Sequence, residues 1–406
     1  MENKLRNYAK LAIQVGINIA PGQELVLNAP TNAIPFARMV VEEAYAAGAK
    51  DVHVFWNDEI TSKTRYKMAP DQAFETFPAW RAEGLETIAK NGGAFLTILT
   101  PNPELMKDID PHRMQTWNRT AMTALAGYRH YTMNGLCSWS LLTIPSQAWA
   151  SKVFPNDAPE TAMDKLWSQV FSIVRIDQDD PVQAWKDHIA FLKDRLDLLN
   201  SKGFHSLRYQ SKTCDFTIDL PDNHIWVGGS ILNAKGRDFV PNLPTEEVFT
   251  SNLKSGINGW VKATRPLSYQ GYLITDFSIW FEKGKIVCYE AASGQEALKS
   301  LIETDEGSHF IGEVALVPYD SPISNSNIVF YNTLYDENAS CHLAIGNAYG
   351  MCLKNGDQMN EEELANAGLN RSLAHSDFMI GSADLSIVGI TKSGEEIQLF
   401  IDGNWA

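Results

Sequence analysis

The sequence of 406 residues lacks the short motifs that mark several common enzyme classes. It contains no HExxH motif, so a single-zinc protease site is unsupported, and no GxSxG motif, so a serine nucleophile elbow is unsupported as well. Neither a GxGxxG motif after the first expected strand nor a GxxxxGK[ST] motif occurs, so the usual phosphate-binding loops are missing. Any chemistry must come from residues that are spread over the chain.

Cysteine is also scarce. The five cysteines are widely scattered, odd in number and free of any CxxC pair: Cys137, Cys214, Cys288, Cys341 and Cys352. This distribution argues against a disulfide framework and against a structural zinc site built on cysteines. We expect reduced and mostly buried thiols.

Long apolar runs and an excess of positive charge are missing too. No run reaches the about 18 apolar residues that a membrane helix needs, and the first residues do not resemble a secretory signal. We therefore expect a cytoplasmic protein with no membrane partner. The 34 basic residues are outnumbered by 49 acidic ones, and because nucleic-acid binding needs a dominant positive field, we expect no nucleic-acid partner.

What the sequence does contain is a two-part pattern of secondary structure. A hydrophobic content of 44% allows a large core, and the length favours two domains. In the first half, strands expected at 24–27, 51–56 and 94–99 are separated by helices expected at 35–48 and 80–91. Alternation of this kind predicts a largely parallel, two-sided α/β layer.

An amphipathic helix expected from Pro181 to Lys202 marks the end of this pattern. After it, short strands and turns dominate, and 282–285 is typical of a hairpin turn. We predict an α/β N-terminal domain at 1–203, which serves as scaffold and gate. We predict that a β-rich α+β catalytic domain follows at 204–406.

Metal-capable side chains lie in short apolar segments of this second half. On a strand, His375 and Asp377 project from one face about 7 Å apart, which lets them converge on one ion, although an isolated HxD triplet is more often a surface pair. Glu313 precedes the apolar segment 314–317, at the mouth of an expected buried strand. A lone carboxylate there needs a cation or a raised pKa.

Two further acidic segments have ordinary alternatives. Glu337 precedes His342 in a stretch that also fits an exposed turn. Glu246 and Glu247 precede the apolar Val248, where an exposed turn or the first turn of a helix would fit as well. If these two glutamates are extended, they face opposite sides, so only one should reach a metal.

Together these segments resemble the signature segments of the aminopeptidase T / aminopeptidase S family of metallopeptidases. The matching segments, in order and at matching spacing, are 242–250, 312–317, 336–342 and 375–381. The resemblance extends over nearly the whole chain. It implies a two-metal aminopeptidase that removes the N-terminal residue from peptides with a free N-terminus, and a cytoplasmic homodimer.

The resemblance also implies a site. The implied metal ligands are Glu247, Glu313, Glu337, His342, His375 and Asp377. Glu313 is our choice for a carboxylate that bridges two divalent ions. Zinc and cobalt suit this mixture of carboxylate and imidazole best, while magnesium and manganese stay open.

Two more residues are assigned roles beside the metals. Tyr349 falls where the family has a tyrosine, and its phenol could donate to the oxyanion of the reaction; a core tyrosine is the alternative. Glu246 would support a ligand or act as general base.

Two other functions stay open at this stage. One is a different two-metal hydrolase, such as a phosphoesterase, although a phosphate dianion usually calls for several basic residues and Arg371 alone is insufficient. The other is a non-catalytic α/β binding protein with a structural metal.

Overall fold

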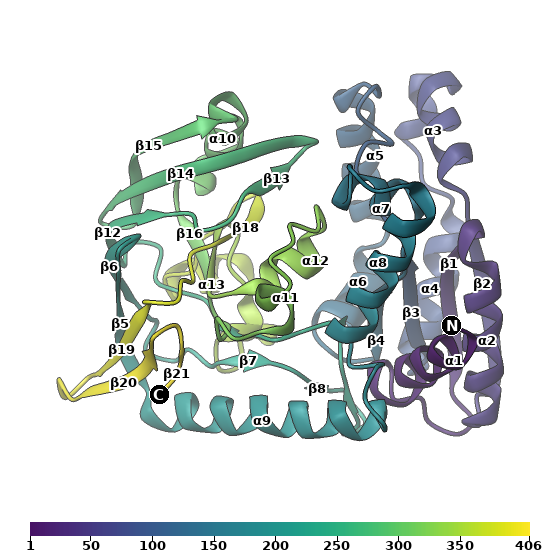
Figure 1. Ribbon diagram of the computed structural model, residues 1–406, viewed down its shortest axis with the longest axis horizontal. Coiled ribbons are helices and arrows are strands. Elements are labelled where there is room, and N and C mark those ends of the chain that lie inside the picture. Colours follow the sequence, from purple (N-terminus) through teal and green to yellow (C-terminus); the bar gives the residue numbers. More distant parts are fainter. The chain divides into compact units, whose positions relative to one another are not determined.

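The computed structural model describes all residues from Met1 to Ala406, which form two compact units (Figure 1). Unit 1 comprises Met1–Ile189 and Ser230–Pro244, and unit 2 comprises Ala190–Gly229 and Thr245–Ala406. These units differ from the predicted division at residue 203 in the placement of 190–203 and 230–244. The second difference arises because strand β10 (Asn242–Leu243) pairs with β4 (Trp139–Thr143) and so adds an edge to the sheet of unit 1.

Unit 1 is built on a parallel sheet with the strand order β10-β4-β3-β1-β2. Its other strands are β1 (Glu24–Pro30), β2 (Asp51–Asn57) and β3 (Ala94–Leu99). Parallel neighbours require crossover connections, which here contain helices. The helices are α1 (Glu2–Leu11), α2 (Ile34–Ala46), α3 (Glu59–Met68), α4 (Ala79–Lys90), α5 (Pro111–Ala124), α6 (Ala126–Met133), α7 (Gln147–Val153) and α8 (Pro159–Ile173). The predicted parallel α/β architecture is confirmed.

Local sequence explains where these elements begin and which face they bury. Helix α5 has Pro111 at its first position and Asp110 as its N-cap, and the carboxylate of Asp110 accepts the amide N–H of His112. On one face of the sheet, Val26 and Phe95 pack against side chains of α4 and against Tyr128 of α6. The alternation of strands and helices therefore follows from local sequence features such as N-caps, prolines and the spacing of apolar residues.

Unit 2 contains a large antiparallel sheet with the order β13-β14-β12-β6-β5-β19-β20-β21, and β15 pairs with β14. The strands are β5 (Phe204–Ser211), β6 (Cys214–Asp219), β12 (Ile257–Lys262), β13 (Leu267–Tyr269), β14 (Tyr272–Glu282), β15 (Lys285–Ser293), β19 (Ser386–Thr391), β20 (Glu396–Ile401) and β21 (Asn404–Trp405). The predicted hairpin turn is confirmed: Lys283 and Gly284 connect β14 to β15, both with positive φ, as a two-residue turn of type I′ requires.

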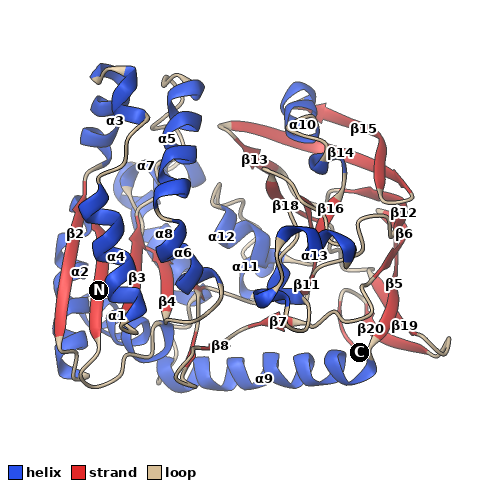
Figure 2. Cartoon of the chain, turned by 180° about the vertical axis from the view of Figure 1, so that it is seen from behind, coloured by secondary structure: helices blue, strands red, loops and turns tan.

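A small antiparallel sheet, with the order β18-β17-β16-β11-β7, is the second sheet of unit 2 (Figure 2). Its strands are β7 (Val227–Gly228), β11 (Val248–Thr250), β16 (Ile311–Leu316), β17 (His342–Gly346) and β18 (His375–Met379). Short helices lie between the strands in sequence: α10 (Gln295–Ile302), α11 (Pro322–Asn325), α12 (Thr333–Asp336) and α13 (Glu361–Asn366). The predicted β-rich α+β character of the second half is confirmed. Helix α9 (Pro181–Lys202) contributes residues to both units.

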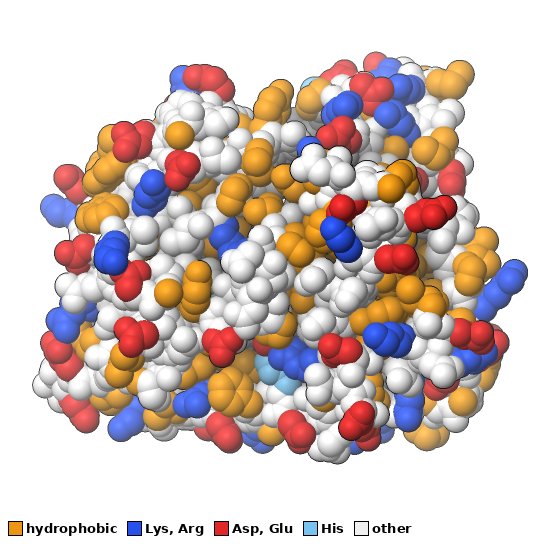
Figure 3. Space-filling model, in the orientation of Figure 1, with side chains coloured by type: hydrophobic (Ala, Val, Ile, Leu, Met, Phe, Trp, Pro, Cys, Tyr) orange, Lys and Arg blue, Asp and Glu red, His pale blue; other side chains and the backbone are white.

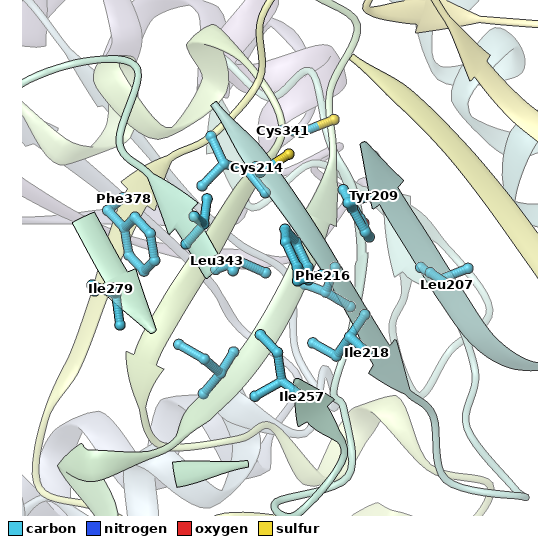
Figure 4. Close-up of a cluster of buried hydrophobic side chains, with 14 of the residues drawn as sticks. Leu207, Tyr209, Cys214, Phe216, Ile218, Ile257, Ile279, Cys341, Leu343 and Phe378 are labelled. Atoms are coloured by element: carbon cyan, nitrogen blue, oxygen red, sulfur yellow. The ribbon is translucent and has the colours of Figure 1, made fainter. Parts of the chain in front are cut away.

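One hydrophobic core lies between the two sheets of unit 2 (Figure 4). Leu207, Phe216 and Ile257 come from the large sheet, and Leu343 and Phe378 come from the small one; all are at most 2% exposed. Burying a side chain of this size contributes about 1.5–3 kcal/mol. One face of the small sheet therefore packs against this core.

The surface and the cysteines agree with the composition. On the face drawn in Figure 3, acidic side chains are interspersed with basic ones. All five cysteines are free, and only Cys288 is exposed, which confirms the expectation of mostly buried thiols. No helix has the length and apolar character to span a membrane.

Candidate metal centre

The two faces of the small sheet differ in character because side chains alternate along a strand. Val314, Leu316, Leu343, Ile345 and Phe378 point into the core. The opposite face carries the polar side chains of the same strands. Each of the strands β16, β17 and β18 therefore has one series of apolar side chains that faces the core and one series that is available for a functional site.

Strand register brings the polar side chains of β16, β17 and β18 together. Across the sheet, Glu313 pairs with Ala344, which pairs with Asp377, and His375 pairs with Gly346. The small residues leave room between the functional side chains. At Gly346, φ is +110° and a Cβ atom would clash with the carbonyl oxygen of Ala374, so glycine is required there.

One detail of the sequence prediction is wrong. Strand β16 begins at Ile311, so Glu313 lies inside the strand and not at its mouth. The sequence placed the strand start at the apolar run 314–317, whereas the irregular register between Ile311 and Glu313 extends the pairing further upstream. Glu313 is 4% exposed, which makes its burial more complete than a position at the strand mouth would give.

The glutamate pair before β11 is buried and not helical. Glu246 and Glu247 are 4% and 8% exposed and lie in an irregular segment, which excludes both the exposed turn and the helix cap. Val248 points into the core, so Glu247 lies on the other side of the chain. Only Glu247 belongs to a group of converging ligand atoms, as the alternation predicted.

Glu247, Glu313 and His342 form what we call the buried trio, whose ligand atoms all lie within 4.8 Å of one another. Nε2 of His342 is 3.1 Å from Oε2 of Glu247 and 3.7 Å from Oε1 of Glu313. The side chain of His342 is 1% exposed. Its Nδ1 lies 3.2 Å from the carbonyl oxygen of Ser340, an acceptor that orients the ring so that Nε2 faces the carboxylates.

Glu313, His375 and Asp377 form a second group, the open trio, whose ligand atoms also lie within 4.8 Å of one another. Nε2 of His375 is 3.5 Å from Oε2 of Glu313 and 3.5 Å from Oδ1 of Asp377. The side chain of His375 is 24% exposed, more than any other member of the two trios. Glu313 is shared: one carboxylate oxygen faces each trio.

Glu337 lies close to the trios but belongs to neither. It begins the 3₁₀ turn Glu337–Ala339 and is half-buried, so the alternative of an exposed turn is excluded. Its carboxylate is near enough to Asp377, Glu247 and Glu313 to be repelled by all three. The segment thus adds a fourth carboxylate to the cluster.

Tyr349 stands beside the open trio. Its hydroxyl oxygen is 3.3 Å from Nε2 of His375, and its ring packs against the rings of His375 and Phe249. Nδ1 of His375 lies 2.9 Å from the carbonyl oxygen of Asn347, which fixes the ring as Ser340 does for His342. Sequence reasoning missed these two carbonyl groups, because any residue type supplies a backbone oxygen.

The pKa values reflect excess negative charge in a buried place. Burial, reinforced by the charge of Asp377, raises the pKa of Glu313 to about 7, and contact with His342 offsets this only in part. Burial and the charges of Asp377 and Glu247 raise the pKa of Glu337 well above its usual value. Burial alone would lower the pKa of His375, but contact with Asp377 outweighs it and raises that pKa to about 9.

His342 behaves in the same way. Burial would lower its pKa, but hydrogen bonds to Glu247 and Glu313 raise the pKa well above the usual value for histidine. Burial also raises the pKa of the Tyr349 phenol, so its hydroxyl keeps its proton and can donate a hydrogen bond. Each raised pKa favours the protonated form of its group in this carboxylate-rich cluster.

The residues fit divalent cations. In the two trios, three carboxylates and two imidazoles converge, and the carboxylate of Glu337 lies beside them. Divalent cations would balance this negative charge and release protons on binding. Oδ1 of Asp377 is buried without a hydrogen bond, as expected of a ligand atom. Mixed carboxylate and imidazole sets suit zinc and related metals. Metal ions bound by such a set of residues can activate water, which is the chemistry of a metal-dependent hydrolase.

Comparison with known proteins agrees with this class. Residues 1–405 match the model of the family described as thermophilic metalloprotease (M29). Aminopeptidase AmpS of Bacillus subtilis (strain 168) is 49% identical over 403 residues, which cover 99% of this chain and 98% of that protein. Aminopeptidase T of Thermus aquaticus is 37% identical over 405 residues, covering 99% of this chain and 98% of that protein. The chain belongs to the thermophilic metalloprotease (M29) family.

A solved structure shows the same fold. Wild-type AmpT from Thermus thermophilus superposes with a TM-score of 0.92 at 34% identity, covering 100% of this chain and 99% of that one. The resemblance seen in the four signature segments is thereby confirmed. So is the prediction of an α/β sheet domain followed by a β-rich one.

Proposed function

We propose that this metal-dependent aminopeptidase holds two divalent cations with Glu247, Glu313, Glu337, His342, His375 and Asp377, and that it hydrolyses the first peptide bond of substrates with a free N-terminus. The family and the aminopeptidases among its relatives support the activity. The observation that carries the two-cation part is the position of Glu313, whose two carboxylate oxygens face separate trios.

Two cations held by these residues would supply a nucleophilic water at neutral pH and an electrophile for the substrate carbonyl oxygen. The protein's own residues do the rest. Tyr349 keeps its proton and can donate it in a hydrogen bond to the developing oxyanion. Glu246 is buried next to Glu247, and its proposed role is either to support that ligand or to act as the general base for the attacking water.

Recognition of the N-terminus needs a group that binds a free amine. A carboxylate of the cluster can do this, and so can an open metal position that takes the neutral amine. Either arrangement fails when the amine is acetylated, because the amide nitrogen carries no charge and no available lone pair. We therefore expect acetylated peptides to be cleaved poorly, and equal rates on free and acetylated peptides would indicate an endopeptidase.

The decisive experiment combines elemental analysis of the purified protein with hydrolysis of leucine arylamide before and after chelation. We expect about two metal ions per chain, loss of turnover with chelator and recovery with added metal. Metal-free protein that still cleaves the arylamide would refute the proposal. Zinc and cobalt are the metals to add first, because both accept imidazole and carboxylate ligands.

The phosphoesterase alternative gains no support from Arg371 or Arg265, because both guanidinium groups are already engaged. The guanidinium of Arg371 pairs with Glu361, and that of Arg265 donates to the backbone carbonyl oxygens of Ile328 and Ser324. Neither is held ready for a phosphate dianion. Turnover of phosphate esters but not of arylamides would reverse this preference. The homodimer and the cytoplasmic location implied by the resemblance stay predictions.

A further inference from the structure

Asn338 is a fully buried polar residue that the proposed chemistry does not use. It is 0% exposed and directly follows Glu337 in the 3₁₀ turn. Its amide nitrogen donates to the carbonyl oxygen of Leu334 at 2.9 Å. Its amide oxygen accepts the backbone N–H of Glu246 at 2.7 Å, across 92 positions of sequence.

This second hydrogen bond joins two segments that each carry a proposed ligand. Glu246 precedes Glu247 of the buried trio, and Asn338 follows Glu337. The segment around Glu246 has no regular secondary structure, so no ladder of backbone hydrogen bonds holds it in place there. Between the paired strands β10 and β11, which end at Leu243 and begin at Val248, its position therefore depends on individual contacts such as the one to Asn338.

The turn that carries Asn338 is held firmly on its other sides. The hydroxyl of Ser321 donates to the carbonyl oxygen of Ala339 at 3.0 Å. The carboxylate of Asp336, also buried, accepts the backbone N–H groups of Phe330 and Asn332. Because the turn is anchored independently of the Glu246 segment, Asn338 can act as a fixed point for that segment.

We infer that Asn338 is a positioning residue that sets the place of Glu247 relative to Glu337 and so determines the affinity of the cation held by the buried trio. The inference rests on the proposed two-cation function. Metal ligands must meet an ion at about 2.0–2.2 Å, so a small shift of the Glu246–Glu247 segment weakens binding. The open trio draws His375 and Asp377 from a regular strand and does not depend on this bond.

The test is metal binding by Asn338→Ala, measured by calorimetric titration of the metal-free full chain with Co²⁺ and by elemental analysis. We expect one of the two binding steps to weaken by about 10–100-fold, the usual effect of removing a group that orients a ligand. The other step should be unchanged. The cobalt absorption spectrum of the variant should resemble that of His342→Ala, which damages the buried trio, and not that of His375→Ala.

Two more variants separate positioning from a general loss of stability. Asn370 is also 0% exposed, and its amide donates to the backbone carbonyl oxygens of Gly307 and Gly346. Asn370→Ala should therefore cost similar stability while the buried trio keeps its cation. Asn338→Asp retains an acceptor for the Glu246 amide. It should therefore bind the Co²⁺ of the buried trio more tightly than Asn338→Ala does.

The outcomes distinguish this inference from the proposed function. If the wild-type chain binds fewer than two cations, the two-cation proposal fails. If it binds two and Asn338→Ala binds both unchanged, or loses both equally, the role of Asn338 is refuted. Equal effects of Asn338→Ala and Asn370→Ala on the same binding step would also refute it.

Discussion

The two trios of the metal centre share Glu313 but are built in different ways. The open trio takes His375 and Asp377 from one strand, two residues apart, and leaves His375 partly exposed. The buried trio takes Glu247 from an irregular segment and His342 from a strand 95 positions later, and both are nearly inaccessible. A local pattern thus specifies one half of the centre, and long-range packing specifies the other.

This difference suggests a division of roles. Under the proposed function, the exposed edge of His375 and the adjacent Tyr349 hydroxyl would make the open trio the side that contacts the substrate. The buried trio is surrounded by protein, and its geometry depends on contacts such as that of Asn338 with Glu246. The open trio suits the exchange of substrate and water, and the buried trio suits the permanent retention of a cation.

Removing the charge of Glu313, which both trios share, should impair cation binding by both trios. Glu313→Gln keeps the shape of the side chain but removes the charge that both trios need. We expect a loss of at least about a thousandfold in kcat, as for other residues that act as one catalytic unit. Elemental analysis should show that both cations are lost or weakened.

Glu290→Gln, at an exposed position of β15, is the matched control and should behave as the wild type. Retention of two tightly bound cations by Glu313→Gln would contradict a shared carboxylate. Loss of only one would mean that Glu313 serves a single trio.

A change at Tyr349 should affect the open side alone. Tyr349→Phe removes the donor but keeps the ring that packs on Phe249. We expect kcat to fall by about 10²–10³-fold, with metal content unchanged. Tyr209→Phe is the control, because Tyr209 is a fully buried tyrosine of the same unit whose hydroxyl has no hydrogen bond. Similar kcat values for the two variants would remove Tyr349 from the mechanism.

The histidines should differ in their effect on the stability of metal-free protein. His342→Ala leaves Glu247 without its closest partner in a nearly dry site, which costs about 3–5 kcal/mol when a buried pair is broken. His375→Ala should cost less, about 1–3 kcal/mol, because water can reach the partly exposed position. Urea unfolding at neutral pH measures both. Equal losses of stability in the two variants would mean that the difference in solvent exposure between the trios has no energetic effect.

The pH dependence of metal-free protein should be the smallest of these effects. The pKa of Glu313 in the folded protein, about 7, lies above its usual value of 4.5, so its burial destabilises the fold increasingly as pH rises between these values. The folded pKa of His375, about 9, lies above 6.5, so its contribution is complete below pH 6.5 and is lost as pH rises through 9.

Glu313 and His375 both lower the stability of the metal-free fold as pH rises. Chelated protein should therefore be less stable at pH 9 than at pH 6. Thermal unfolding of chelated and metal-loaded samples over this range measures the effect. Metal should flatten the curve, because cations replace the protons and protons are released on binding. If the chelated protein gains stability with rising pH, Glu313 and His375 do not interact with their neighbours as the geometry indicates.

Much of the fold could be predicted from periodicity. The parallel sheet of unit 1 follows from apolar runs separated by helical segments, and the hairpin at Lys283 and Gly284 follows from its turn residues. The return of 230–244 to unit 1 could not be predicted, because a two-residue strand such as β10 has no periodic signal. The ligand set stays a prediction until metal binding is measured.

The sequence by itself determined which side chains share a face of one strand, because alternation is a property of the extended backbone. This is why it could predict that His375 and Asp377 share a face and that only one of Glu246 and Glu247 reaches a metal. Only the tertiary structure decided that β16 lies between β11 and β17, that Glu313 faces two trios, and that Asn338 holds the Glu246 amide. Those relations join residues far apart in the chain, and they arise from the packing of two sheets around one core.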